Sequence, residues 1–199
     1  MPRGVEPPAI PLNERSDEAL ARSARAGAPA ALETLVARFE PRLMAFFRSR
    51  GVGRHAAEDL FQETVLQMWR RLDQYDASRP LAPWLFTIAA RLMHKDGARR
   101  RRRRQREAVA AARRDHTNGA HADPSGDAPL WRLASRVLND EAHTALWLRY
   151  AEDMQPQHIA AVLGKRPGAV RVLLHRARRR LAEALAEPAQ PAAREGVNA

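Results

Sequence analysis

Apolar residues recur every three or four positions along most of this chain, and this spacing limits the fold more than any other feature. The clearest stripe consists of Leu32, Leu35, Val36, Phe39, Leu43, Phe46 and Phe47. A period of 3.6 residues predicts amphipathic helices, whereas a half-buried strand would alternate apolar and polar residues. No segment of the sequence alternates in that way, and no internal repeat is present. We therefore predict an all-α fold.

Capping residues and helix breakers give the expected helix ends. Ser16 and Asp17 predict a helix start and Gly27 its end, because Ser and Asp accept hydrogen bonds from the first turn and Gly tolerates the left-handed cap. In the first half, further helices are expected from Pro29 to a break at Gly51 and over residues 55–72 and 83–95. In the second half, helices are expected over residues 130–138, 141–152, 156–163 and 163–185.

A polar segment separates these two groups of helices. It contains Asn118-Gly119, Asp123-Pro124 and Ser125-Gly126, which are typical of loops. We predict two small helical domains joined by a flexible linker, which would reach ~80 Å fully extended but average only ~28 Å when relaxed. The predicted boundaries are a disordered N-terminal arm at 1–13, a first domain at 14–104, the linker at 105–129, a second domain at 130–187 and a disordered tail at 188–199.

The charge balance indicates the kind of partner. The chain holds 34 Lys and Arg against 23 Asp and Glu, a net charge of +11, which favours an anionic partner such as nucleic acid. Cysteine is absent, so disulfides and thiolate metal sites are excluded. No apolar run approaches the ~18 residues of a membrane span, and the first residues lack the apolar core of a signal peptide. We expect a cytoplasmic protein.

The segment from Leu163 to Leu185 has one apolar and one strongly basic face. It opens with two cations, Lys165 and Arg166, where a helix normally prefers acids, so an external anion would offset their cost. A short helix, the Gly164 turn and this helix form a helix-turn-helix pattern, whose second helix enters the major groove of DNA. We expect base contacts from Arg171 and His175 in particular. The full set of expected DNA contacts is Lys165, Arg166, Arg171, Val172, His175, Arg176 and Arg179.

The expected helix over residues 55–72 has two unlike faces. The more apolar face, assigned to the core, carries Leu60, Phe61, Thr64, Val65, Met68 and Leu72. The opposite face carries Asp59, Gln62, Glu63, Leu66 and Trp69. An exposed Trp and Leu beside carboxylates suit a protein interface, although from the residues alone Trp69 could equally pack on a neighbouring helix. A metal site is not expected here, because Glu58 points away from Asp59 and Glu63 and no His joins them.

Three stretches of the sequence resemble one protein family. "HIAAVLGKRPGAVRVLLHRARRRLAEAL" resembles region 4 of the extracytoplasmic-function (ECF) sigma factors. "AAEDLFQETVLQMWRRLDQYD" is similar to a helix of their region 2, and "PWLFTIAARLMHKDGARRRRRR" to the helix that follows it. The three stretches come in the family's order, from about Asp17 to Leu185, which makes the resemblance more specific than one helix-turn-helix would be.

This resemblance implies a function and partners. A sigma factor binds core RNA polymerase, recognises −35 promoter DNA through region 4 and opens −10 DNA through region 2. It implies that Asp59, Gln62, Glu63, Leu66 and Trp69 contact the clamp helices of the largest polymerase subunit. An anti-sigma factor is a further candidate partner.

The resemblance also implies where −10 DNA would bind. The loop from Tyr75 to Trp84 and the helix after it resemble the segment that reads this element, and an aromatic side chain among cations suits single-stranded DNA. The expected contacts are Tyr75, Arg79, Arg91, Lys95, Arg99 and Arg100. Six consecutive arginines, Arg99 to Arg104, would follow phosphates. Trp84 and Ile88 are expected to be mostly buried.

Other functional classes leave fewer traces. The sequence shows no Ser/His/Asp order, no metal cluster and no phosphate-binding glycine loop, so we expect no catalytic residues, metal or cofactor. One alternative is a stand-alone helix-turn-helix regulator that binds duplex DNA without polymerase. Another is a nucleic-acid-processing enzyme that uses the carboxylates near Asp59.

Overall fold

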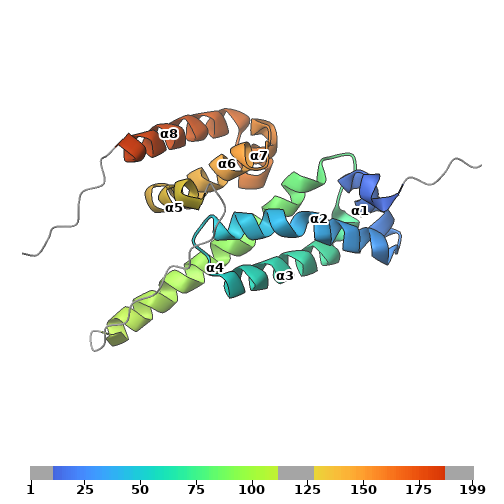
Figure 1. The fold of residues 1–199 in the computed structure, drawn as a ribbon, viewed down its shortest axis with the longest axis horizontal. Helices are drawn as coiled ribbons and strands as arrows, with labels where there is room; N and C mark the ends of the chain where they lie inside the picture. Colours follow the sequence, from blue (N-terminus) through green and yellow to red (C-terminus); the bar gives the residue numbers. More distant parts are fainter. Residues whose placement is uncertain (1–10, 112–127, 187–199) are drawn as a thin grey trace, which may run out of the picture.

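The structure, a computed structural model, describes residues 11–111 and 128–186, with side chains described as far as Gly97 and again from Pro129. Apart from two short 3-10 turns, the regular elements in these ranges are all α-helices, as predicted (Figure 1). The first group is α1 (Asp17–Arg25), α2 (Pro29–Arg48), α3 (Arg54–Arg71) and α4 (Leu81–Ala111). The second group is α5 (Ala128–Val137), α6 (Asp140–Tyr150), α7 (Pro156–Leu163) and α8 (Pro167–Ala186).

Helix ends follow the capping residues of the sequence. The Ser16 hydroxyl accepts a hydrogen bond of 3.2 Å from the backbone N–H of Ala19 at the start of α1. Asn139 caps α6 in the same way, accepting 2.8 Å from Ala142. Gly164 ends α7 with a φ of +64°, a left-handed conformation that costs a residue without Cβ least. This turn connects the two helices of the helix-turn-helix.

The helices α1–α4 pack around a core dominated by aromatic residues of α2. α2 contacts α1, α3 and α4, so its apolar stripe is enclosed from several sides. Phe46 lies 5.6 Å from Phe47 and 5.5 Å from Phe86 of α4, measured between ring centroids. The largest fully buried side chains of this group are Leu20, Leu35, Phe39, Leu43, Phe46, Phe47, Met68, Leu81, Leu85 and Phe86.

The helices α5–α8 form a second, smaller unit in which α8 packs on α5, α6 and α7. Val170, Leu174 and Ala177 point into this core, as the apolar face of the sequence predicted. Leu185, expected on the same face, is instead exposed, because it lies in the last turn of α8.

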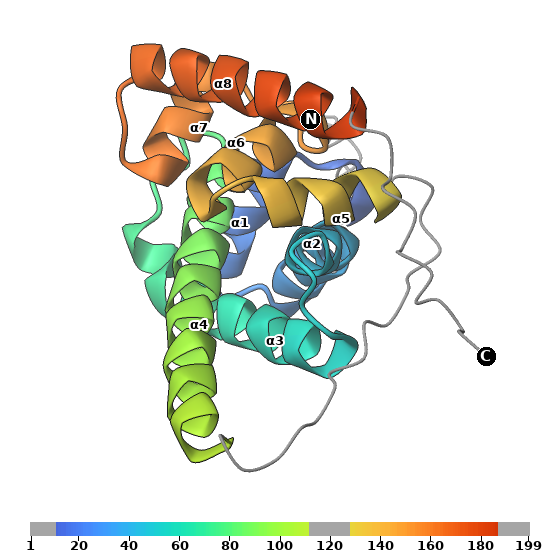
Figure 2. The same cartoon turned by 90° about the vertical axis from the view of Figure 1, so that its left-hand side faces the viewer.

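The two units are packed together rather than held apart. α4 contacts α7, and the buried apolar residues of both units belong to one continuous cluster. Figures 1 and 2 both show α8 on one outer side of the molecule and α3 on the opposite side. The two candidate binding helices therefore face away from each other.

Three expected boundaries are corrected by the structure. α4 was expected over residues 83–95, but it begins at Leu81 and continues to Ala111, because arginine and alanine are strong helix formers. It therefore includes the arginine run. The linker was predicted at 105–129, but its first residues belong to α4 and its last residues belong to α5. In the predicted disordered arm, Leu12 starts a 3-10 turn and packs against the core. Residues 1–10 and 188–199 lie outside the described residues.

Candidate nucleic-acid and protein interfaces

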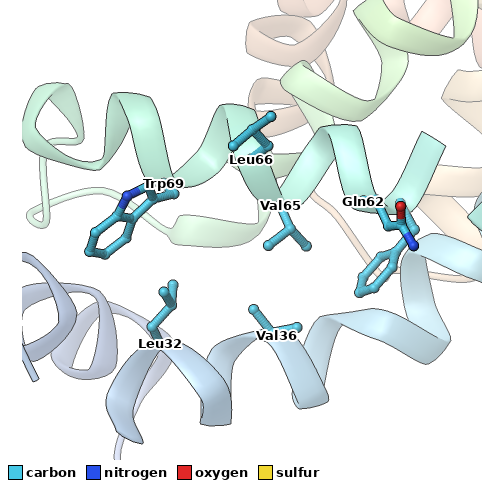
Figure 3. A pocket seen from close by; sticks show the side chains of 7 residues that line it. Leu32, Val36, Gln62, Val65, Leu66 and Trp69 are labelled. Carbon is cyan, nitrogen blue, oxygen red and sulfur yellow. The ribbon is translucent and has the colours of Figure 1, made fainter. Parts of the chain in front are cut away.

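An apolar groove runs between α2 and α3. Its volume is about 380 Å³, and its walls are formed by Leu32, Val36, Phe61, Gln62, Val65, Leu66 and Trp69. Figure 3 shows Leu32 and Val36 of α2 pointing across the groove toward Trp69 and Val65 of α3. Trp69 is 51% exposed and Leu66 40% exposed, so two large apolar side chains meet solvent at one site. Such a patch on a folded domain indicates a binding surface.

The predicted division of α3 into two faces is confirmed in part. Leu60, Thr64 and Met68 are buried, and Leu66 and Trp69 are exposed, as expected. Phe61 and Val65 were assigned to the core, but they are half-buried and line the groove. They lie at the edge of the apolar stripe, where α2 approaches α3 without covering them. Leu32 and Val36 also line the groove, and the sequence had placed them only in the core stripe of α2.

The rim of the groove is acidic and polar. Asp59 and Gln62 are exposed, and Glu63 is half-buried. The Glu63 carboxylate accepts a hydrogen bond of 2.8 Å from Gln67 Nε2, one turn further along α3. An apolar floor with this rim suits a partner that presents apolar side chains flanked by cations.

Tyr75 was predicted to stack on DNA, and its position does not fit that role. The side chain is 4% exposed. Its hydroxyl donates a hydrogen bond to the Arg79 carbonyl, and its ring lies 5.1 Å from the Trp84 ring. Burial, with nearby Glu18 second, raises the pKa of Tyr75 to about 12. Tyr75 is thus a structural anchor of the loop between α3 and α4, a role that the local sequence pattern does not distinguish from stacking.

The other expected −10 contacts are placed on or near α4. Arg79 is exposed in the loop and lies 3.3 Å from Asp76. Arg91 and Lys95 are exposed and four residues apart, so they share one face of α4. Arg99 continues that spacing along the α4 backbone, but its side chain and that of Arg100 lie outside the described part. Ile88 is buried as expected, whereas Trp84 is half-buried against Tyr75.

The basic face of α8 is open to solvent. Arg171, Val172, His175, Arg176 and Arg179 are all exposed and lie on the face of α8 opposite the buried Val170, Leu174 and Ala177. Arg166, just before α8, is exposed as well. Arg179 Nε lies 3.3 Å from Glu183 Oε1, one turn later. This surface has the shape and charge of a recognition helix.

Lys165 differs from its expected state. Its ammonium lies 3.1 Å from Glu141 Oε2, in the first turn of α6. The sequence suggested that an external anion would offset both cations at the start of α8. The structure provides an internal carboxylate for Lys165, because α6 packs on α8 and brings Glu141 close to Lys165.

Two further features of the described residues concern membrane spans and metal sites. None of the helices in the described ranges is long and apolar enough to cross a membrane. Among residues 11–111 and 128–186, as far as their side chains are described, no three His, Asp or Glu come together as a metal site.

Both units match known families. The Sigma-70 region 2 family matches residues 35–106, which include most of α2, all of α3 and most of α4. The Sigma-70 region 4 family matches residues 131–181, which include the helix-turn-helix. The two matches follow each other in the order of the two helical units.

Similar proteins cover most of the chain. CarQ, an RNA polymerase sigma factor of Myxococcus xanthus, is 35% identical over 82% of this chain and 94% of CarQ. ShbA, an ECF RNA polymerase sigma factor of Streptomyces griseus, is 32% identical over 85% of this chain and 94% of ShbA.

Two solved structures share the fold. CnrH, in complex with the cytosolic domain of CnrY, has a TM-score of 0.65 and 28% identity over 86% of this chain and 97% of CnrH. The sigma factor RpoE of Bartonella quintana, in complex with the anti-sigma factor NepR, has a TM-score of 0.57 and 26% identity over 73% of this chain and 90% of RpoE. Sequence and fold agree, and the chain belongs to the ECF family of RNA polymerase sigma factors.

Proposed function

We propose that this sigma factor docks on core RNA polymerase through the groove between α2 and α3. The main support for this proposal is that Leu66 and Trp69 are exposed at the apolar groove. Its rim carries Asp59, Gln62 and Glu63. The occupant would be the clamp helices of the largest polymerase subunit, as the resemblance to the sigma factor family implies. Buried tryptophans at interface centres often carry much of the binding energy.

The same proposal assigns −35 duplex to α8. Arg171 and His175 lie within the first three turns of α8, which in a helix-turn-helix face base edges. Val172 is exposed one position after Arg171 and can contact a thymine methyl group. Arg166, Arg176 and Arg179 would contact phosphates, which position the helix without reading sequence. Lys165 would join them by exchanging Glu141 for a phosphate.

We propose that cationic side chains, rather than an aromatic ring, contact −10 DNA. Arg79, Arg91 and Lys95 are exposed in and after the loop that Tyr75 anchors. Arg99 and Arg100 follow on the same helix and would extend this path along the phosphates. Tyr75 would act by holding the loop in place.

A regulatory protein partner and a cellular site of action are proposed as well. CnrH was solved with the cytosolic domain of CnrY and RpoE with the anti-sigma factor NepR, and an anti-sigma factor is proposed for this chain by analogy. Its site of action would be the cytoplasm, and no catalytic step, metal or cofactor is part of the function. A stand-alone regulator is disfavoured because both sigma regions match, in order.

The test is transcription in vitro with core polymerase and a library of genomic promoters. Added to core enzyme, the protein should direct initiation at a restricted set of promoters. Alone, it should bind the same promoters poorly at physiological salt, because one recognition helix buries too little surface for tight specific binding. Nanomolar sequence-specific binding by the free protein, without stimulation of core enzyme, would identify a stand-alone regulator instead.

Two arginines of α8 should respond differently to substitution. Arg171→Ala should cost ~1–3 kcal/mol on the preferred −35 site and relax its sequence preference. Arg179→Ala should weaken all sequences alike and reduce the salt dependence of binding, because a phosphate contact carries no sequence information. Binding of holoenzyme to matched and scrambled −35 duplexes, over a range of salt concentrations, measures both. Equal losses on the two duplexes for Arg171→Ala would exclude base reading by Arg171.

A further inference from the structure

The loop of residues 75–80, between α3 and α4, is held at both ends by α1. α1 packs on α4 and on the 3-10 turn Leu72–Gln74, which leads into the loop (Figure 1). Two polar side chains of α1, Arg25 and Glu18, form hydrogen bonds with the backbone at the beginning and at the end of the loop. These bonds join residues 50 and 63 positions apart in the sequence, so only the folded chain brings them together.

Glu18 caps the start of α4. Its Oε1 accepts a hydrogen bond of 3.1 Å from the backbone N–H of Leu81, the first residue of α4. First-turn N–H groups have no partner within a helix, and Pro80, just before α4, has no side-chain acceptor that could serve as a local cap. Burial alone would raise the pKa of the half-buried Glu18 carboxyl group, but hydrogen bonds, first among them that from Leu81, lower it below its ordinary value. The charged carboxylate also suits the positive end of the α4 dipole.

Arg25 fixes the beginning of the loop. Its Nη1 donates a hydrogen bond of 3.3 Å to the carbonyl oxygen of Tyr75. The ring of Tyr75 is buried against Trp84, and its hydroxyl donates to the Arg79 carbonyl across the loop. Tyr75 is therefore held both by its side chain and, through Arg25, by its backbone.

The middle of the loop is exposed and has contacts of its own. Asp76 Oδ1 accepts hydrogen bonds from the backbone N–H of Ser78, at 3.0 Å, and from the Ser78 hydroxyl, at 2.7 Å. Asp76, Ser78 and Arg79 are all exposed. These internal contacts maintain the shape of the loop, but they do not determine where the loop lies on the molecule. Its position depends on the contacts of its two ends, which include those to α1.

We propose that Glu18 and Arg25 are positioning residues for −10 DNA, which hold the 75–80 loop in register with α4 and so determine how sharply the −10 sequence is distinguished. This inference rests on the proposed binding of −10 DNA by the loop and α4. A binding surface discriminates between ligands only when its groups are held within about 0.5 Å of the productive geometry. Loss of either anchor lets the loop move relative to α4, so preferred and substituted −10 sequences are bound more nearly alike.

Single-round transcription by the holoenzyme tests these roles. The templates share one −35 element and differ at single positions of −10, starting from a promoter that the genomic library yields. The −10 preference is the ratio of transcript from the preferred element to transcript from each substituted one. Glu18→Ala and Arg25→Met should each lower this ratio at least threefold, because each releases one end of the loop. Glu18→Gln should restore most of the preference, because its carbonyl oxygen can still accept from the Leu81 N–H.

The matched control is Asp17→Ala, which removes the neighbouring carboxylate of α1, 2.5 Å from Arg38 Nη1 of α2. It should keep the −10 preference, and all variants should keep their helicity by circular dichroism and their preference at −35. An equal loss of transcription from every template by Glu18→Ala, with the ratio intact, would show a merely structural role and overturn the proposal. An unchanged ratio in both Glu18→Ala and Arg25→Met would overturn it as well.

A variant of the DNA contacts themselves separates this inference from the function on which it rests. Replacing Arg79, Arg91 and Lys95 together by Ala removes exposed cations that the proposed function places on −10 DNA. It should lower opening of the −10 region, measured by permanganate reactivity of unpaired thymines, at least tenfold. Reduced opening in this variant, with an unchanged ratio in the α1 variants, would reject the positioning roles and leave the −10 site standing. Unchanged opening in this variant would reject the −10 site and the positioning roles together.

Discussion

Trp69→Ala should weaken binding to core RNA polymerase at least tenfold. Trp69 is 51% exposed at one end of the α2–α3 groove, so its ring contributes little to the core of the free protein. If core polymerase covers the ring, its removal costs ~2 kcal/mol or more, as for other tryptophans at interface centres. Equilibrium binding of labelled protein to core enzyme measures the loss, and thermal melting is followed alongside it.

Glu63→Lys tests the rim of the same groove and should reduce core affinity comparably, because it places like charges against a basic partner. Tyr150→Ala is the control, because Tyr150 is an aromatic residue on α6 that is 56% exposed and lies outside the groove. It should leave core affinity within about twofold, well below the hot-spot range. Melting of the domain by Trp69→Ala would show that its ring is part of the core. Normal core binding by both groove variants would exclude this groove as the docking surface.

Local signals in the sequence predicted the helices well. Ser16, Asn139 and Gly164 each occupy the cap that their side chain or backbone favours. The spacing of Val170, Leu174 and Ala177 identified the buried face of α8. These features depend on residues within one or two turns, so a single sequence contains the information needed to predict them.

Features that depend on a second element were predicted less well. Phe61 and Val65 satisfy the period of a buried stripe, but their exposure depends on how α2 crosses α3. Tyr75 is an aromatic residue beside cations in the sequence, and only the fold shows that Trp84 and the Arg79 carbonyl enclose it. Lys165 acquires Glu141 as a partner from a helix more than twenty residues earlier. In each case the missing information was the position of a distant neighbour.

The packing of the two units is the largest structural feature that the sequence does not predict. A linker sequence sets how far two domains can separate, but it does not show whether they attract each other. Arg42 lies in the amphipathic helix α2, and Arg50 and Glu152 lie in the turns that follow α2 and α6. No periodic pattern distinguishes a charge that pairs across a boundary from one that faces solvent. Their pairing becomes evident only when α2 and α6 are placed side by side.

Phe46→Ala should lower the free energy of unfolding by about 3–5 kcal/mol, the largest stability effect that we expect of one substitution. Phe46 is fully buried and contacts Phe47 and Phe86 within its own unit. Its ring also lies 6.3 Å from the ring of Trp147 in α6. A cavity at this position would therefore weaken the core of α1–α4 and its boundary with α5–α8 together.

Denaturant titration followed by circular dichroism measures this loss, with Phe61→Ala as the matched control. Phe61 is half-buried at the groove, so its removal forms no enclosed cavity and should cost about 1 kcal/mol, the common value for a point substitution.

Leu20→Ala gives a second comparison, because Leu20 is fully buried in α1, which packs on α2 and α4. It should also cost about 2–5 kcal/mol, because its removal leaves an enclosed cavity as well. Equal costs for Phe46→Ala and Phe61→Ala would show that the aromatic cluster is not the main source of stability.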